Sequence, residues 1–502
     1  MAFKKPEPTC PRHESAPNTI LVPAVSRRSV LKGGMAAAGV AVLGSLGELA
    51  LKPEREAWAT TTPPDIQFDL GNFIPPAAVF NDGAGNVTLR FATVFTTFAT
   101  YQLTRTPNRQ DQAILEGALT TIENAYPFSP SGVFTIISYG LPYFNRLPQK
   151  VVQGFVPKLL SDKKRLVLEE AVPSPTDVSP LNPGIKKLTY NVPVVIEGND
   201  LAITLRSDNS SNISDILAWL AGSNRLAGGS MPSPAFNGLL RATSTRVMFQ
   251  QIGMPRKVAD ANNLAFSPRV NRDSPMWMGF ADQQTDGSAP SAQNVTFAGS
   301  STAQLTTSSS GQYFDNGAIQ HLSHNIEDLV QFYANDEPFT ERCQYMFRSN
   351  PIPSLGNSNQ FSNGGGPAYI DNVFQGTDDA RRNAAAVNTF QGQHRMGHIS
   401  ALQRSSRATD GSPLHIRMDG TGFDNLDVPD GSNQPKLQFS AFVPTAEFFR
   451  AMRANQASLD LVQQFGVAPD DNGLERFITA TRRQNFLAPP RRHRAFPLVE
   501  NT

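Results

Sequence analysis

Residues 89–101 read LRFATVFTTFATY, and this stretch decides the predicted fold. It is rich in β-branched and aromatic residues, which favour a strand. The next stretch, Arg109 to Ala125, repeats apolar residues at helical spacing along one stripe, which predicts an amphipathic helix. Residues 132–141 (GVFTIISYGL) then predict a second strand. The folded part of the chain therefore begins with a strand–helix–strand unit.

The same order of elements follows a second time. A third strand is predicted at residues 201–206 (LAITLR), a short helix at 212–221 and a fourth strand at 247–252. Two successive β-α-β units in this order are typical of a ferredoxin-like unit, in which helices cover one face of an antiparallel sheet.

A second α+β half follows a loop at residues 283–312 that is rich in Ser, Thr, Gln, Asn and Gly. Residues 325–334 predict a helix, residues 436–443 (KLQFSAFV) predict an alternating strand, and Thr445 is placed to cap a further helix. Between them, the Gly- and Asn-rich stretch 357–386 is typical of a surface excursion.

The composition excludes two broad classes of protein. The 502 residues are 39% hydrophobic, which is enough for a globular core and excludes a disordered polyelectrolyte. Lys and Arg number 44 against 43 Asp and Glu, and only 17% of residues are charged, so there is no basic surface of the kind that nucleic-acid binding needs. We therefore expect no nucleic-acid partner.

An export signal is predicted at residues 1–59. Residues 26–32 (SRRSVLK) form a twin-arginine signature, and an apolar run rich in small residues continues to about Leu51. Residues 57–59 (AWA) fit a signal-peptidase site, so we predict cleavage after Ala59 and a periplasmic or extracellular mature chain that begins at Thr60. The run is too rich in small residues for a stable membrane anchor. The alternative is an ordinary buried helix preceded by two arginines.

The common catalytic signatures are absent from the sequence. It contains no P-loop, no Gly-x-Ser-x-Gly elbow, no His-Glu-x-x-His helix and no Cys-x-x-Cys pair. Cys10 is removed with the predicted signal, so Cys343 remains alone and no intrachain disulfide is expected. Candidate site residues must therefore be isolated polar residues in apolar surroundings.

Two such candidates are Asp282 and His398. Asp282 follows Trp277 and a Gly-Phe turn, where burial would raise its pKa toward general acid–base use; the alternative is a turn aspartate. His398 lies between Gly397 and Ile399 and is a candidate axial metal ligand, with simple packing as the alternative.

Three further groups complete the set of candidates. Arg417 ends an apolar strand, where its guanidinium could stabilise developing negative charge or pair with a neighbouring carboxylate. His321 and His324 would share one face of a helix and could bind a metal, although no carboxylate or cysteine completes the set. Residues 491–494 (RRHR) are interpreted as a solvated C-terminal tail, with contact to an acidic partner as the alternative.

Taken in order, Gly279-x-x-Asp282, Gly397-His398-Ile399 and Ile416-Arg417 resemble the site motifs of the dye-decolorizing peroxidase family. The resemblance covers most of the mature chain. It implies an α+β fold of two ferredoxin-like halves with antiparallel sheets, of the dimeric α+β barrel type. The halves would be residues 60–290 and residues 291–465, the second with the haem site, and residues 466–502 would form a C-terminal tail.

The resemblance also implies a haem peroxidase that uses haem b. His398 would be the iron ligand, Asp282 would move a proton between the two peroxide oxygens, and Arg417 would stabilise the departing charge. Hydrogen peroxide and an organic reductant would be the substrates, and a homo-oligomer would match other members of the family. The apolar walls of the haem site would be Leu437, Phe439 and Phe442.

The sequence departs from the family pattern at three places. Gln283 stands where the family motif has glycine, and residues 418–423 (MDGTGF) replace the usual turn after the arginine, with Asp419 as an unusual acid. His394 lies four residues before His398 and is the alternative iron ligand; the Gly-His-Ile context and the spacing to Arg417 favour His398.

Two other function classes remain open at the level of the sequence. One is a haem-binding or iron-handling protein of the same fold with little turnover, which the loss of the glycine at Gln283 would explain. The other is a cofactor-free secreted binding protein, because fold resemblance alone does not establish a function.

Overall fold

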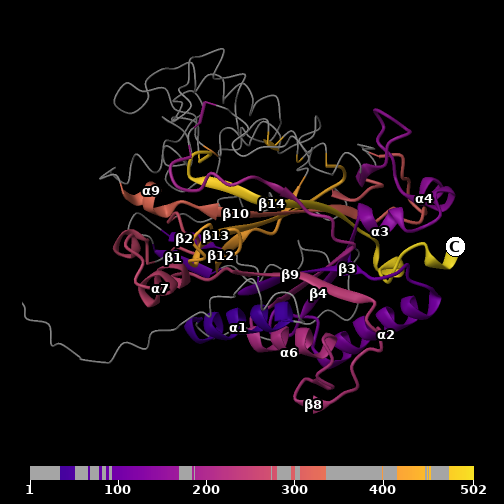
Figure 1. The fold of residues 1–502 in the computed structure, drawn as a ribbon, viewed down its shortest axis with the longest axis horizontal. Coiled ribbons are helices and arrows are strands. Elements are labelled where there is room, and N and C mark those ends of the chain that lie inside the picture. Colours follow the sequence, from indigo (N-terminus) through magenta and orange to yellow (C-terminus); the bar gives the residue numbers. More distant parts are fainter. Residues whose placement is uncertain are drawn as a thin grey trace, which may run out of the picture.

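A computed structural model of the chain shows an α+β protein built around one large sheet (Figure 1). The structure describes the following residues: 34–50, 66–67, 78–81, 86–89, 93–168, 184–185, 187–272, 274–279, 295–299, 306–334, 398, 415–446, 449, 452–453 and 474–502.

The N-terminal half has the strand order of a ferredoxin-like unit. Its elements are β3 (Phe95–Leu103), α2 (Arg109–Ala125), β4 (Phe134–Gly140), β6 (Leu201–Ser207), α6 (Ser210–Leu220) and β9 (Leu240–Phe249). The sheet order β9-β3-β6-β4 places the fourth strand of the unit beside the first and the third between the first and second, with antiparallel pairing throughout. Helices α2 and α6 lie in one layer beneath this sheet (Figure 1).

The C-terminal half repeats this arrangement. Its elements are β10 (Ala318–Glu327), α9 (Leu329–Ala334), β11 (Ile416–Arg417), β12 (Gly420–Asp424), β13 (Gln434–Val443) and β14 (Ile478–Ala488). The order β14-β10-β13-β12 is again fourth, first, third, second. Pairing of β14 with β4 and of β12 with β9 joins the halves into a closed barrel. The predicted α+β class with two ferredoxin-like halves is confirmed.

Shorter elements complete the described part of the chain. They are α1 (Gly34–Leu49), β1 (Ala78–Asn81), β2 (Asn86–Leu89), α3 (Leu141–Asn145), α4 (Gln149–Phe155), β5 (Val195–Ile196), β7 (Arg225–Leu226), β8 (Gly229–Ser230), α7 (Met254–Ala261) and the 3-10 turns Ser267–Arg269, Arg491–His493 and Val499–Asn501. No helix among the described residues is both long and apolar enough to span a bilayer.

Local sequence signals explain why helix α2 forms at the predicted residues. Helix α2 has the predicted bounds because of a capping box at its start. The Asn108 side chain accepts hydrogen bonds from the backbone amides of Gln110 and Asp111, and the Asp111 carboxylate accepts one from the backbone amide of Asn108. Ala118, Leu119 and Ile122 are buried along the expected stripe, and Leu115 is buried beside them.

Four predictions about the elements are wrong. The strand predicted at 247–252 is β9, which covers Leu240–Phe249. The first strand begins at Phe95 rather than at residue 89, and the helix predicted at 325–334 begins only at Leu329, because residues 318–327 continue as strand β10. Residues 466–502 are not a tail, since they contain β14, which pairs with β10, β4 and β5. The predicted boundaries at residues 290 and 465 and the excursion at 357–386 lie outside the described residues.

The seam between β4 and β14 is closed by a side chain. These strands pair only at Phe486–Gly140 and Leu487–Tyr139. Beyond that point the buried Gln67 amide accepts a hydrogen bond from Ile137 N at 2.5 Å and donates to Ile137 O at 2.6 Å and Pro489 O at 3.0 Å. Gln67 therefore supplies the hydrogen bonds that a longer strand would make.

We expect Gln67→Ala to lower the free energy of unfolding by about 1–3 kcal/mol, because it leaves buried backbone groups at Ile137 and Pro489 unpaired. Urea denaturation measures the change. Gln102→Ala is the matched control, because its amide lies near the surface, where it donates to Gly198 O at 3.2 Å and accepts from Arg241. Equal stability of the two variants would show that Gln67 does not close the seam.

Candidate functional site

The two faces of strand β13 have different environments. Alternate residues point to opposite sides of a strand. Phe442 belongs to the apolar cluster inside the barrel together with Ile416 and Met418. Leu437 and Phe439 therefore lie on the outer face, where both are half-buried. Phe442 does not share a wall with them, and the predicted wall of three residues is wrong on this point.

The outer face carries Arg417. In the sheet, Arg417 is paired with Ala441, Ala441 with His321, and His321 with Asn485. Residues paired across antiparallel strands point to the same side, so this row lies on the face of Leu437 and Phe439. Asp419, two residues after Arg417 in extended backbone, alternates onto the same side while Met418 is buried in the barrel.

A strip of buried polar side chains runs along β10 on this face. The polar strip consists of His321, Ser323, Asn325 and Glu327, all less than 9% exposed. Within the described part of the chain, Glu327 Oε2 is buried without a hydrogen-bond partner, and so is Nδ2 of Asn485, which is paired with His321 across the sheet. Burial raises the pKa of Glu327 to about 8. Buried polar groups are normally satisfied, so a strip of this kind indicates a face that meets a ligand or ordered water.

His321 is held rigidly in the polar strip. Its Nδ1 is 2.6 Å from Asn485 Oδ1, its Nε2 is 2.7 Å from Ser323 Oγ, and its ring stacks on Phe449 with centroids 3.4 Å apart. Burial, together with the nearby Arg483 and Arg453, lowers the pKa of His321 to about 3, so the ring is neutral. Both ring nitrogens are engaged in hydrogen bonds, which argues against His321 as a metal ligand.

His324 lies on the other face of β10. Its Nδ1 is 2.9 Å from Gln438 Oε1, and its Nε2 is 3.5 Å from the carboxylate of Asp424, which also lies 3.5 Å from Lys436 Nζ. Because β10 is a strand, residues three apart point to opposite sides, and the two histidines do not share a metal. The described residues contain no cluster of three or more His, Cys, Asp and Glu side chains that could hold a metal ion.

His398 lies close enough to Arg417 for the guanidinium charge to act on its ring. Burial, and then the charge of Arg417, lower the pKa of His398 to about 4, so its imidazole is neutral at physiological pH. Within the part of the chain that the structure describes, His398 Nδ1 is buried and has no hydrogen-bond partner. The charge of Arg417 therefore reaches the ring of His398.

The remaining candidates are only partly placed. Asp282, Gln283 and His394 lie outside the described residues. Gly279, which opens the Asp282 motif, has a φ of +86°, and Trp277 beside it is fully buried, donating to Gly422 O at 3.0 Å. The arginines at 491–494 are not a solvated tail, because Arg494 is 2% exposed and pairs with Glu116 and Glu123.

The described residues include a neutral imidazole at His398, and a permanent cation and an apolar wall on the outer face of the sheet. Such a set can bind a metal-containing group through His398 and stabilise negative charge through Arg417. The sequence does not reveal the polar strip, because its last two members, Asn325 and Glu327, fall in a segment whose pattern predicts a helix. In AIQHLSHNIE (318–327), positions 321, 323, 325 and 327 are all polar, and this spacing of two is the available signal for a strand.

Comparison with known proteins gives one family match. A model described as a family of unknown function (DUF7405) matches residues 94–490. No curated protein matches the chain.

The chain is also similar to several solved structures at low identity. One is a putative dyp-type peroxidase from Shewanella oneidensis, with 13% identity, TM-score 0.45, and coverage of 82% of this chain and 95% of that one. A second is a dye-decolorizing peroxidase from Bacteroides thetaiotaomicron, with 12% identity, TM-score 0.40, and coverage of 86% and 99%. A third is a DypB variant from Rhodococcus jostii in complex with haem, with 12% identity, TM-score 0.43, and coverage of 79% and 93%.

Proposed function

The chain belongs to the family of unknown function DUF7405, and we propose that it is a haem b peroxidase that is exported folded by the twin-arginine route. It would reduce hydrogen peroxide and oxidise an organic substrate in the periplasm or outside the cell. The observation that supports the proposal is that the ring of His398, a half-buried residue, is held neutral and feels the charge of Arg417, two residues that the sequence motifs single out separately.

The residues present fit a haem group. A histidine that binds iron must be neutral, and the low pKa of His398 keeps its imidazole neutral at every physiological pH. The buried Nδ1 of His398 needs a partner that the described residues do not provide. Leu437 and Phe439 offer half-buried apolar surface on the face that carries Arg417, as a largely hydrophobic macrocycle requires.

Each residue would have one task in the reaction. Haem bound at His398 would supply the redox chemistry of peroxide reduction. Arg417, which stays charged at all relevant pH values, would stabilise negative charge on the departing oxygen of hydrogen peroxide. Asp282 would accept a proton from one peroxide oxygen and return it to the other, so that water can leave. Leu437 and Phe439 would exclude bulk water from this face.

The test of the proposal is an absorption spectrum of the protein produced with haem supply. We expect a Soret band that His398→Ala abolishes, because an alanine offers the iron no ligand, and that His394→Ala retains. Thermal unfolding of each variant shows whether it is folded. A band that is lost in His394→Ala and kept in His398→Ala would reassign the ligand, and no band in the folded wild type would contradict the proposal.

A Soret band without peroxide-dependent turnover would favour the second candidate function, a haem-binding or iron-handling protein. The observation in its favour is Gln283, which replaces the glycine of the family motif next to Asp282.

A further inference from the structure

Helix α1 (Gly34–Leu49) is packed into the folded N-terminal half. It contacts α6, β9 and α7, and it lies in the same layer as α6 beneath the sheet (Figure 1). Leu43 is 0% exposed and Leu46 is 1% exposed, and both belong to the main hydrophobic core. Val42, Leu49 and Ala50 are partly buried against the same core. Helix α1 therefore buries a continuous apolar face of the kind that fixes a structural helix.

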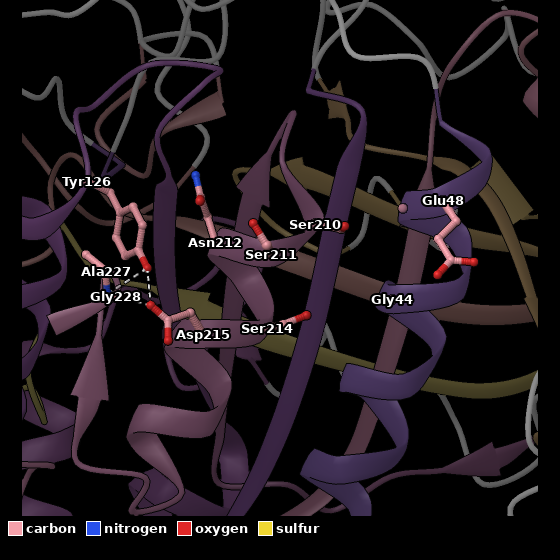
Figure 2. Close-up of a pocket in the computed structure, with 11 residues that line it drawn as sticks. Gly44, Glu48, Tyr126, Ser210, Ser211, Asn212, Ser214, Asp215, Ala227 and Gly228 are labelled. Carbon is pink, nitrogen blue, oxygen red and sulfur yellow. Dashed lines mark hydrogen bonds between the residues drawn. The ribbon is translucent and has the colours of Figure 1, made fainter. Parts of the chain in front are cut away.

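The contact between α1 and α6 is close because of one glycine. A Cβ added at Gly47 would lie 2.2 Å from Ser210 Oγ and 3.3 Å from Ser210 Cβ, whereas a Cβ added at Gly44 would have nothing within 4 Å. Both glycines border an open cleft of about 940 Å³ between α1, the first turns of α6 and the turn at Ala227 (Figure 2). Gly47 thus faces the neighbouring helix and Gly44 faces open space.

The far wall of this cleft is fixed by hydrogen bonds. Asp215 accepts from Tyr126 OH at 2.6 Å and from Ala227 N at 2.5 Å, as the dashed lines in Figure 2 show. These bonds belong to the mature part of the chain and hold α6 in place beside α1. The surface that receives α1 is therefore a rigid feature of the N-terminal half.

We propose that residues 34–49 are a permanent helix of the folded protein and remain attached to it, instead of being removed by cleavage after Ala59. The surface on α6, β9 and α7 fits an apolar helix with small residues, and its occupant is the chain's own α1. Cleavage would remove Leu43 and Leu46 from the core and leave their positions open to water. The twin-arginine segment would then direct export without being discarded. The inference does not depend on haem binding.

The first test is the N-terminus of the protein isolated from its native host. Intact-mass measurement is expected to show a chain that still contains residues 34–49. A homogeneous species beginning at Thr60 would overturn the proposal.

The second test uses the two glycines of α1 as a matched pair in the full-length chain. Gly47→Leu and Gly44→Leu add the same side chain to the same helix, three residues apart. We expect Gly47→Leu to lower the Tm by at least about 3 °C, because the new side chain meets Ser210, and Gly44→Leu to leave it within about 1 °C. Failure of Gly47→Leu alone to fold would also support docking. Equal Tm values for both variants would overturn the proposal, because they would show that α1 is not packed against α6.

Discussion

Replacing Arg417 by alanine is expected to lower the rate of peroxide-dependent oxidation by about 100- to 1,000-fold while the Soret band remains. The guanidinium lies on the outer face of the C-terminal half, close enough to His398 to lower the pKa of its ring, and Leu437 and Phe439 restrict water on that face. In such surroundings a fixed positive charge stabilises a departing anion far better than it would in water. Alanine removes this charge and leaves His398, the proposed iron ligand, in place.

The measurement is steady-state turnover of an organic reductant at saturating peroxide, with the Soret band of each variant recorded in parallel. Arg417→Lys keeps the charge but loses the planar guanidinium with its several N–H donors. We expect its turnover to lie between those of Arg417→Ala and the wild type. Arg225→Ala is the control, because Arg225 is an exposed arginine in β7 and its replacement should leave turnover unchanged. Full turnover in Arg417→Ala would show that the charge on this face does not act on peroxide.

The fold was predictable where local signals and the tertiary structure agree. Helix α2 has its capping box and its apolar stripe in the sequence, and its predicted bounds match the structure. Strand β10 was partly mistaken for a helix because residues 325–334 contain apolar residues at helical spacing, and the pairing with β13 and β14 overrides that local pattern. Strand β14 was missed because its outer face carries Arg483 and Asn485, which look like surface residues in a sequence.

The site was predictable to the extent that it rests on sequence motifs. His398 and Arg417 are identified from their immediate neighbours in the sequence, and the charge of Arg417 acts on the His398 ring. The polar strip could not be identified in this way, because Ser323, Asn325 and Glu327 are ordinary surface residue types and only the folded sheet shows that they are buried. Phe442 is a different case, because alternation along the strand already places position 442 on the face opposite to 437 and 439.

The C-terminal segment, which the sequence suggests is a tail, is bound to helix α2 by Arg494. We expect Arg494→Met to lower the free energy of unfolding by about 3–5 kcal/mol at pH 7. The Arg494 guanidinium is 2% exposed and pairs with Glu116 and with Glu123, which is itself only 16% exposed. Removing the cation leaves Glu123 with Arg491 as its remaining partner, and methionine restores the volume of the side chain but not the charge. Arg109→Met is the control, because Arg109 is exposed and makes a single bond to the same C-terminal segment.

The cost of Arg494→Met should depend on pH in a defined direction. Burial alone would raise the pKa of Glu123, but the hydrogen bonds from Arg491 and Arg494 outweigh burial and hold the pKa below its usual value. A carboxylate with a lowered pKa in the folded state contributes stability above its unfolded pKa of about 4.3, and that contribution is lost as the pH falls through the folded pKa. Urea denaturation of wild type and Arg494→Met should therefore show a smaller difference at pH 3 than at pH 7. A difference that is constant between these pH values would mean that Arg494 stabilises the C-terminal segment through packing and not through its charge.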